Sequence, residues 1–300
     1  MRNLRLRQLA SVVCALFLLV SVDLAAQRFR ATIDTVQVSV TVTDVNGRLV
    51  TGLSRDDFEV LEDGTPQPIT VFTDERVPIS LGVLLDSSDS MRGQRITDAR
   101  GAVDRFVSTL LEAGDEAFIA AFNHKPRLVS VWTQPPAMLA GTLDQLFASG
   151  ATALYDALVA SAPLFGRRAH ARAAMIVISD GVDTASDVSL RRASDIIRRF
   201  EPLVYAIAID SERASPAARV NPEALREITA TSGGYTEVVR TSADLGPATE
   251  RIANELNKQY TLGYVPSKPP DNGWRGIRVR VRNTDYFTRA RRGYYAMRSR

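Results

Sequence analysis

The chain has 300 residues, of which 45% are hydrophobic and 24% are charged, and its formal net charge is +3. These proportions are ordinary for a globular protein, and the length suits one large domain with a small one beside it. So small a net charge gives no support to nucleic-acid binding, and we expect no nucleic-acid partner. Cys14 is the only cysteine, so no disulfide framework can form.

Residues 1–26 predict a secretory signal peptide. Arginines stand near the start, an apolar core runs from Leu9 to Val22, and the small residues Ala25 and Ala26 follow. An uncleaved membrane anchor is the alternative, although this core is shorter than the roughly 20 residues that a spanning helix needs. We therefore expect an exported protein, periplasmic or at the cell surface, with no membrane span after the signal is removed.

Residues 27–76 predict a small β-module. From Val36 to Val42, valines alternate with polar residues, a pattern typical of a half-buried strand. Asn46-Gly47 is then expected to close a hairpin. Two more short strands are expected on either side of the Asp63-Gly64 turn, at Phe58–Leu61 and Ile69–Phe72.

Between residues 77 and 260, strand-like runs alternate with helical patterns. We expect strands at Ile79–Asp86, Ala117–Asn123, Arg127–Trp132, Ala174–Asp180, Leu203–Asp210 and Gly234–Val239. We expect helices at about Gly93–Leu111, Pro136–Phe147, Leu154–Phe165, Leu190–Phe200, Pro222–Ser232 and Ala243–Tyr260. Such alternation predicts a doubly wound, mainly parallel α/β sheet with helices on both faces and one antiparallel hairpin at its edge.

Residues 261–300 return to a β pattern. Three apolar residues from Ile277 to Val281 alternate with Arg278, Arg280 and Arg282. We expect this segment to pair with the 27–76 module, because neither fragment buries enough apolar surface alone. The fold class is then α/β with a small accessory β-domain built from both ends of the chain. The arginines could hold an acidic polymer or membrane headgroups, or they could simply form a solvated strand face.

Oxygen side chains gather where the buried strand Leu81–Asp86 ends. Asp86, Ser88 and Ser90 follow at alternate positions, at the edge of the sheet where open α/β folds bind ligands. Carboxylate and hydroxyl oxygens suit Mg²⁺ or Ca²⁺ and suit zinc poorly. Three ligands leave a six-coordinate ion incomplete, so other loops must contribute. Thr152, before a helical pattern, and Asp180, at the end of a second buried strand, are the candidates.

This set, Asp-x-Ser-x-Ser with a distant Thr and a distant Asp-Gly, resembles the metal-ion-dependent adhesion site of von Willebrand factor type A domains. The flanking stretches Asp57–Val60, Gln259–Tyr264 and Arg292–Ala296 are similar to those of bacterial exported proteins related to that family. The resemblance implies a Rossmann-like domain over residues 77–260. It implies Mg²⁺, or Mn²⁺ or Ca²⁺, and a partner protein whose carboxylate completes the coordination shell. The metal ligands it implies are Asp86, Ser88, Ser90, Thr152 and Asp180.

Asp89 departs from the family pattern, which has glycine between the two serines. If its carboxylate points inward, the site becomes net negative and disfavours an acidic partner residue. We therefore predict that Asp89→Gly strengthens the binding of an acidic ligand and leaves the fold unchanged.

Each motif also has a structural alternative. Ser90 could cap the helix that begins near Gly93, and Asp180-Gly181 could be an ordinary turn. Asp156 and Asp183 lie near the same rim, and we expect them to be capping or solvated residues.

Three classes of function are compatible with these observations. The leading one is an exported, metal-dependent protein-binding module. The second is a scaffold with a vestigial metal site that binds partners through its β-domain. The third is a metal-dependent or serine hydrolase, but no Gly-x-Ser-x-Gly motif occurs, and only His124 and His170 offer imidazole bases. We therefore expect no catalytic residues and no enzyme.

Overall fold

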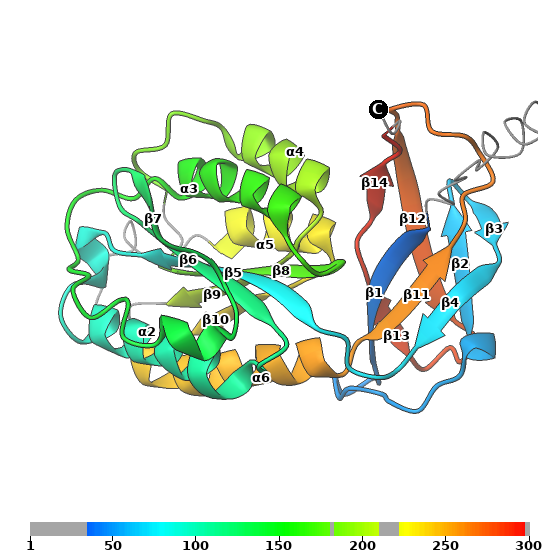
Figure 1. Ribbon diagram of the computed structural model, residues 1–300, viewed down its shortest axis with the longest axis horizontal. Helices are drawn as coiled ribbons and strands as arrows, with labels where there is room; N and C mark the ends of the chain where they lie inside the picture. Colours follow the sequence, from blue (N-terminus) through cyan, green and yellow to red (C-terminus); the bar gives the residue numbers. More distant parts are fainter. Residues whose placement is uncertain (1–34, 181–182, 210–221, 298–300) are drawn as a thin grey trace, which may run out of the picture. The chain divides into compact units, whose positions relative to one another are not determined.

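The computed structural model describes residues 35–180, 183–209 and 222–297 (Figure 1). The predicted signal peptide at 1–26 and Cys14 lie outside these residues. Within the described part of the chain, no helix is long and apolar enough to cross a bilayer.

A six-stranded sheet forms the centre of the α/β part. Its strand order is β10-β9-β8-β5-β6-β7, and every neighbouring pair is parallel except β6 and β7. The strands are β5 (Ile79–Asp86), β6 (Glu116–Phe122), β7 (Pro126–Thr133), β8 (Arg172–Ser179), β9 (Leu203–Ile209) and β10 (Thr236–Val239). Every residue of β5, β6, β8 and β9 is buried, as expected for strands covered on both faces. The predicted fold class, with its single antiparallel edge pair, is confirmed.

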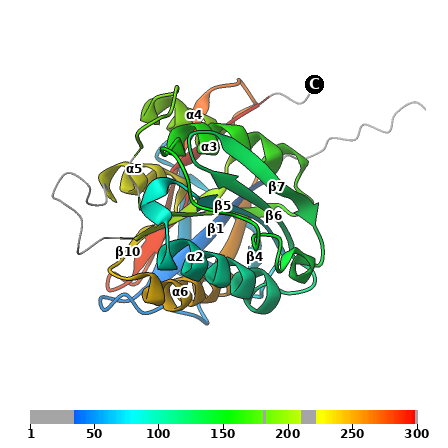
Figure 2. The same ribbon diagram turned by 90° about the vertical axis from the view of Figure 1, so that its left-hand side faces the viewer.

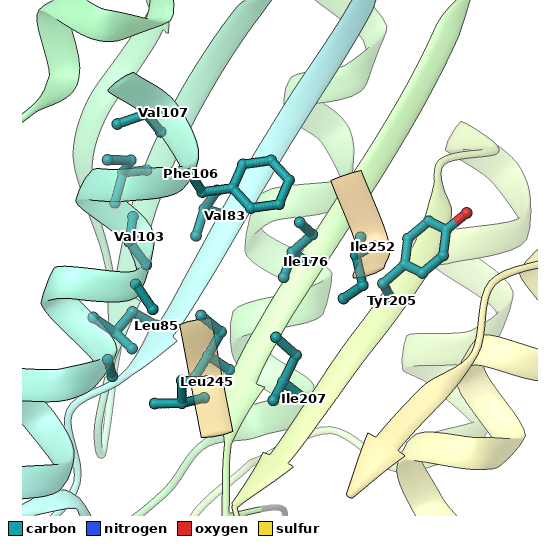
Figure 3. Close-up of a cluster of buried hydrophobic side chains, with 14 of the residues drawn as sticks. Val83, Leu85, Val103, Phe106, Val107, Ile176, Tyr205, Ile207, Leu245 and Ile252 are labelled. Carbon is teal, nitrogen blue, oxygen red and sulfur yellow. The ribbon is translucent and has the colours of Figure 1, made fainter. Parts of the chain in front are cut away.

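Helices cover both faces of this sheet (Figure 2). They are α2 (Gln94–Arg105), α3 (Leu154–Ser161), α4 (Leu190–Phe200), α5 (Pro222–Ser232) and α6 (Leu245–Asn257). Helices α2 and α6 share one buried cluster with alternate strand residues, and Figure 3 shows Val83, Ile176 and Ile207 of that cluster facing Phe106 and Ile252. Helices α3, α4 and α5 share a second cluster on the opposite face.

Close packing on the second face depends on a glycine in β5. A Cβ atom at Gly82 would lie 2.5 Å from Cζ of Phe118 and 3.0 Å from Cζ of Phe165. The two rings pack edge to face, with centroids 5.6 Å apart, and fill the space that the missing side chain leaves.

The predicted helix over Pro136–Phe147 is wrong. Only a short 3₁₀ segment, Pro136–Leu139, forms there, and turns follow it. Gly141 has a φ of +76°, which interrupts any helix, although Leu143 and Leu146 are still buried in the first cluster. Leucines spaced three and four apart gave the helical pattern, and successive turns place them inward just as a helix would.

Two antiparallel four-stranded sheets form the β part. Their orders are β13-β1-β11-β4 and β14-β12-β2-β3. The strands are β1 (Val36–Thr43), β2 (Phe58–Glu62), β3 (Thr65–Gln67), β4 (Ile69–Thr73), β11 (Tyr260–Tyr264), β12 (Trp274–Val281), β13 (Phe287–Arg289) and β14 (Gly293–Tyr295). Strand β1 pairs with β11 and β13, and β12 pairs with β2, so each sheet combines both ends of the chain. The predicted division of the chain into residues 1–26, 27–76, 77–260 and 261–300 remains a prediction.

Local pairings in the β part differ from expectation. The hairpin expected at Asn46-Gly47 is reduced to one bridge between Thr43 and Leu49. Strand β2 turns at Asp63-Gly64 into β3, whereas β4 lies in the other sheet beside β11. The third buried cluster of the molecule lies between these sheets, with Val38, Val40, Phe58, Tyr260 and Leu262 among its members.

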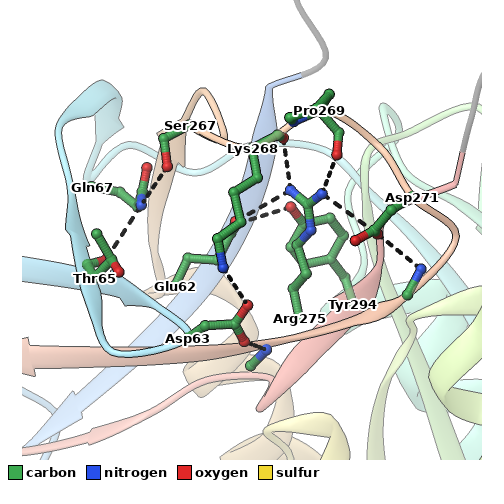
Figure 4. A network of polar contacts seen from close by, with 12 residues as sticks. Glu62, Asp63, Thr65, Gln67, Ser267, Lys268, Pro269, Asp271, Arg275 and Tyr294 are labelled. Atoms are coloured by element: carbon green, nitrogen blue, oxygen red, sulfur yellow. Dashed lines mark hydrogen bonds and ion pairs between the residues drawn. The ribbon is translucent and has the colours of Figure 1, made fainter.

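A buried ion pair closes one end of the β part (Figure 4). Arg275 and Glu62 are 3.3 Å apart, with side chains only 3% and 1% exposed. The hydroxyls of Tyr264 and Tyr294 each donate to Oε2 of Glu62 at 2.8 Å, and Arg275 donates to the carbonyl of Lys268 at 2.9 Å. These bonds satisfy both buried charges and tie the β11–β12 connection to the sheet.

Candidate functional site

Strands β5 and β8 end side by side at one edge of the central sheet. They pair in parallel with Leu85 opposite Ile178, so Asp86 and Ser179 end neighbouring strands, and Asp180 is the next residue. The first loop of the site follows Asp86, the second contains Thr152, and the third begins at Asp180. Parallel pairing therefore brings the first and third loops to the same edge, where doubly wound sheets bind ligands.

Asp86 is fully buried and is held by two donors. The backbone N–H of Ser88 donates to Oδ1 at 2.8 Å, and the Ser179 hydroxyl donates to Oδ2 at 2.7 Å. Burial raises the pKa of the Asp86 carboxyl to about 6, against the lowering effect of these hydrogen bonds, and the charge of Asp180 raises it further. A nearby positive charge would stabilise this carboxylate.

The two serines of the first loop lie together. Their hydroxyl oxygens, on Ser88 and Ser90, are 2.9 Å apart. Ser88 precedes a 3₁₀ segment, Asp89–Met91, without making a side-chain capping bond, and helix α2 has Gly93 at its N-cap. The alternative that Ser90 caps this helix is therefore wrong. Both hydroxyls remain available to a ligand.

Asp89 points toward solvent and not into a buried site. Its carboxylate is 57% exposed and lies 2.7 Å from the guanidinium of Arg92. Its backbone N–H donates to the carbonyl of Gly150 at 2.8 Å, which joins the first loop to the second. The negative charge of Asp89 is thus partly balanced by the positive charge of Arg92.

Thr152 is buried in the second loop, which is tied to the loops on both sides. Ser149 N–H donates to the carbonyl of Ser87 at 2.7 Å. The carbonyl of Thr152 accepts the N–H groups of Thr184 and Ala185, at 2.8 and 3.0 Å. These backbone bonds hold the loop that carries Thr152 between the segments that carry the other candidate ligands.

One side-chain oxygen of Asp180 differs from the other donors of the site in its hydrogen bonding. The residue is 8% exposed, and its Oδ1 is buried without a hydrogen-bond partner among the described residues. A buried carboxylate oxygen left unsatisfied costs on the order of 1–3 kcal/mol or more, and native proteins rarely leave one so. The atom therefore indicates a missing partner, such as a cation or water.

The donor set fits a hard divalent cation. Two carboxylates and three hydroxyls come from the three loops, and all are oxygen donors. Within the described ranges there is no group of three or more His, Cys, Asp or Glu side chains placed to hold a metal, so no competing site of that kind appears there. The buried, unpartnered Oδ1 of Asp180 and the buried carboxylate of Asp86 are both consistent with such an ion.

Asp156 and Asp183 act as structural residues, as predicted. Oδ1 of Asp183 accepts the N–H of Leu154 at 2.8 Å at the start of α3. The carboxylate of Asp156 accepts the N–H groups of Asp187 and Val188, each at 3.1 Å. Ser179 is the residue that sequence reasoning missed, because a serine at the end of a buried strand carries no distinguishing pattern until its pairing with β5 is known.

Comparison with known proteins identifies the domain. Residues 81–182 match the von Willebrand factor type A domain family. A von Willebrand factor type A structure from Catenulispora acidiphila is 13% identical, with a TM-score of 0.54, and the match covers 86% of this chain and 72% of that one. No curated protein matches the chain.

Two further solved structures match about three fifths of the chain. The conserved hypothetical protein BatB from Bacteroides thetaiotaomicron is 19% identical, with a TM-score of 0.50, over 60% of this chain and 98% of its own. The vWF domain of the type V pili tip protein Mfa5 from Porphyromonas gingivalis is 14% identical, with a TM-score of 0.51, over 61% and 96%. At these identities the likeness shows the fold alone. Residues 81–182, which lie within the α/β part, are thus similar to von Willebrand factor type A domains.

Proposed function

We propose that the protein is an exported, metal-dependent protein-binding module. In this proposal Asp86, Ser88, Ser90, Thr152 and Asp180 hold Mg²⁺, or Mn²⁺ or Ca²⁺, and a partner protein supplies a carboxylate. The observation that carries the proposal is the buried, unpartnered Oδ1 of Asp180, at the same sheet edge as the hydroxyls of Ser88 and Ser90.

The bound cation would supply an open coordination position for an oxygen of the partner, because Mg²⁺ sites with few direct protein ligands keep exchangeable positions. The chain's own residues do the rest. Ser179 and the N–H of Ser88 fix the orientation of the Asp86 carboxylate. The backbone bonds of Ser149 and Asp89 hold the first and second loops together, so that the donors are arranged before a partner arrives.

No catalytic step belongs to this proposal. His170 lies near the opposite end of β5, where its N–H donates to Ser80, and so it is remote from Asp180 along the strands. We also propose an extracytoplasmic location, supported by the predicted signal peptide and by the likeness to a pilus tip domain. The scaffold alternative, in which partners bind through the β part without a cation, is separated from our proposal by cation dependence.

A capture experiment tests the proposal. The protein, immobilised, is incubated with an envelope extract of its source in Mg²⁺ or in EDTA, and bound proteins are identified by mass spectrometry. We expect a partner that is retained in Mg²⁺, lost in EDTA and lost with Asp180→Asn. Asp187→Asn is the matched control, because this exposed carboxylate follows the same strand and lies outside the donor set. Capture of the same proteins in EDTA would favour the scaffold alternative.

A further inference from the structure

A large cleft lies away from the candidate metal site. It has a volume of about 990 Å³ and is lined by α5, the start of β10, strand β12, the segment 288–292 and the turn after β2. None of the five candidate metal ligands lines it. A cleft of this size is large enough for several residues of an extended chain or for a small ligand.

The side chains of this cleft carry an excess of positive charge. Four arginines line it, at positions 226, 278, 289 and 292, against one acidic residue, Asp63. Asp63 is already engaged, because it accepts the N–H of Gly276 at 2.8 Å and lies 3.5 Å from the ammonium group of Lys268. The cleft therefore attracts anions.

Two of the four arginines have a carboxylate partner and two do not. Arg226 lies 2.6 Å from Glu223, and Arg289 pairs with Glu255. Arg278 and Arg292 are exposed, and neither side chain makes an ion pair or a hydrogen bond with any described residue. An arginine guanidinium binds a carboxylate through two parallel hydrogen bonds, so the cleft offers two such positions.

One strand at this cleft suits the binding of an extended peptide. The cleft reaches Thr236 at the start of β10, which is an edge strand of the central sheet. The backbone of an edge strand has N–H and C=O groups that a further strand can pair with. The guanidinium of Arg289 lies 4.8 Å from the ring centre of Tyr235, a cation–π contact between two side chains that line the cleft.

We propose that this cleft binds an acidic, extended peptide segment of a partner protein, with Arg278 and Arg292 binding its carboxylates. The guanidinium groups would accept any of several anions, but the edge strand favours a peptide over a free phosphate or an acidic polysaccharide, because only a peptide backbone can pair with it. The site uses no cation and is separate from the donor set at the ends of β5 and β8. It is therefore a second contact surface, independent of the metal-dependent one.

Fluorescence anisotropy with a labelled hexaglutamate peptide tests this inference. The titration is performed with the protein in EDTA, so that the candidate metal site plays no part. We expect saturable binding that weakens as salt rises. The double variant Arg278→Gln/Arg292→Gln should bind about tenfold more weakly or worse, because two charge-assisted contacts are lost.

The matched control removes the same charge elsewhere. Arg191→Gln/Arg199→Gln changes two exposed arginines of α4, which does not line the cleft, and should bind the peptide as the wild type does. Asp180→Asn should also bind it normally, so this test and the metal proposal can fail separately. The inference is overturned by the absence of saturable binding, by equal losses in both double variants, or by binding of polygalacturonate or inorganic phosphate in place of hexaglutamate.

Discussion

Ser179 donates its hydroxyl hydrogen to Oδ2 of Asp86 at 2.7 Å, which joins the ends of two neighbouring parallel strands. Because the N–H of Ser88 occupies Oδ1, both oxygens of Asp86 already have a donor. Among the residues that the structure describes, Asp180, the next residue after Ser179, has no such partner for its own buried Oδ1. The two aspartates of the candidate site therefore differ in hydrogen bonding: both side-chain oxygens of Asp86 accept a hydrogen bond, whereas Oδ1 of Asp180 accepts none from a described residue.

The first prediction concerns the pH dependence of stability without metal. Burial raises the pKa of Asp86 from its ordinary 3.8 to about 6, so the folded protein binds this proton more tightly than the unfolded chain does. Protonated Asp86 therefore contributes to the free energy of unfolding. This contribution is fully present below about pH 3.8 and is lost as pH rises through about 6. Two pKa units correspond to about 3 kcal/mol in the free energy of unfolding.

Asp86→Asn removes this buried charge. In EDTA at pH 7 the variant should be more stable than the wild type, by up to about 3 kcal/mol, and the Asp86 contribution to the pH dependence should disappear. Urea unfolding at pH 5 and pH 7.5 measures both effects. Asp187→Asn, at an exposed carboxylate, should leave the pH dependence of the wild type in place. A variant that is less stable than the wild type at pH 7 would show that Asp86 is not strained by burial.

The second prediction concerns the pair formed by Asp89 and Arg92. Both side chains are exposed, so their effect on a nearby cation is small and sensitive to salt. Asp89→Asn should weaken Mg²⁺ binding and Arg92→Gln should strengthen it, each by roughly two- to fivefold at low salt. Binding of an acidic partner residue should change in the opposite direction, because it is repelled by Asp89 and attracted by Arg92. Asp89→Gly should therefore strengthen the binding of an acidic ligand, as the sequence predicts. Calorimetry in low and high salt measures the cation effects, and a change of the same sign in both variants would contradict the account.

Much of the candidate site could be predicted from the sequence, because its residues stand at the ends of strongly apolar strands. An apolar run such as Leu81–Leu85 identifies a buried parallel strand, and its end then identifies the ligand-binding edge. The orientation of Asp89 and the role of Ser179 could not be predicted, since they depend on contacts with Arg92 and with a strand far away in sequence.

The fold shows the same division between local and long-range information. Most strands and helices with a clear period were predicted at nearly their observed positions, and the helix predicted over Pro136–Phe147 is the exception. The arrangement of β1, β11 and β13 in one sheet and of β2 and β12 in another depends on partners more than 200 residues apart, and no local pattern specifies it. Strand β14 was not predicted because its three residues are too few to show alternation.

The third prediction concerns the buried ion pair of the β part. Glu62→Gln leaves the guanidinium of Arg275 buried with only the exposed carboxylate of Asp271, 3.5 Å away, as a negative partner, and should lower the free energy of unfolding by about 3 kcal/mol. Glu223→Gln is the control, because it removes one partner of an exposed pair and should change stability by no more than about 0.5 kcal/mol. Chemical unfolding of the two variants measures the difference. Equal losses would show that burial does not set the strength of the Glu62 pair.

The fourth prediction compares two glycines. A Cβ atom at Gly234 would lie 1.9 Å from the backbone oxygen of Val204, which cannot move without displacing β9. Gly234→Ala should therefore destabilise the protein by several kcal/mol, on the order of other overpacked core sites or more. Gly101 lies inside α2 with nothing within 4 Å of a new Cβ, and Gly101→Ala should stabilise by about 0.5–1 kcal/mol. Thermal unfolding ranks the two variants, and the reverse order would contradict the packing around β9.

Isothermal titration of Mg²⁺, Mn²⁺ and Ca²⁺ into the metal-free protein tests the central claim most directly. The account predicts one saturable site in the wild type, lost in Asp180→Asn and kept in Asp187→Asn. Wild-type protein that binds none of the three ions, or an Asp180→Asn variant that binds them as tightly as the wild type, would contradict it.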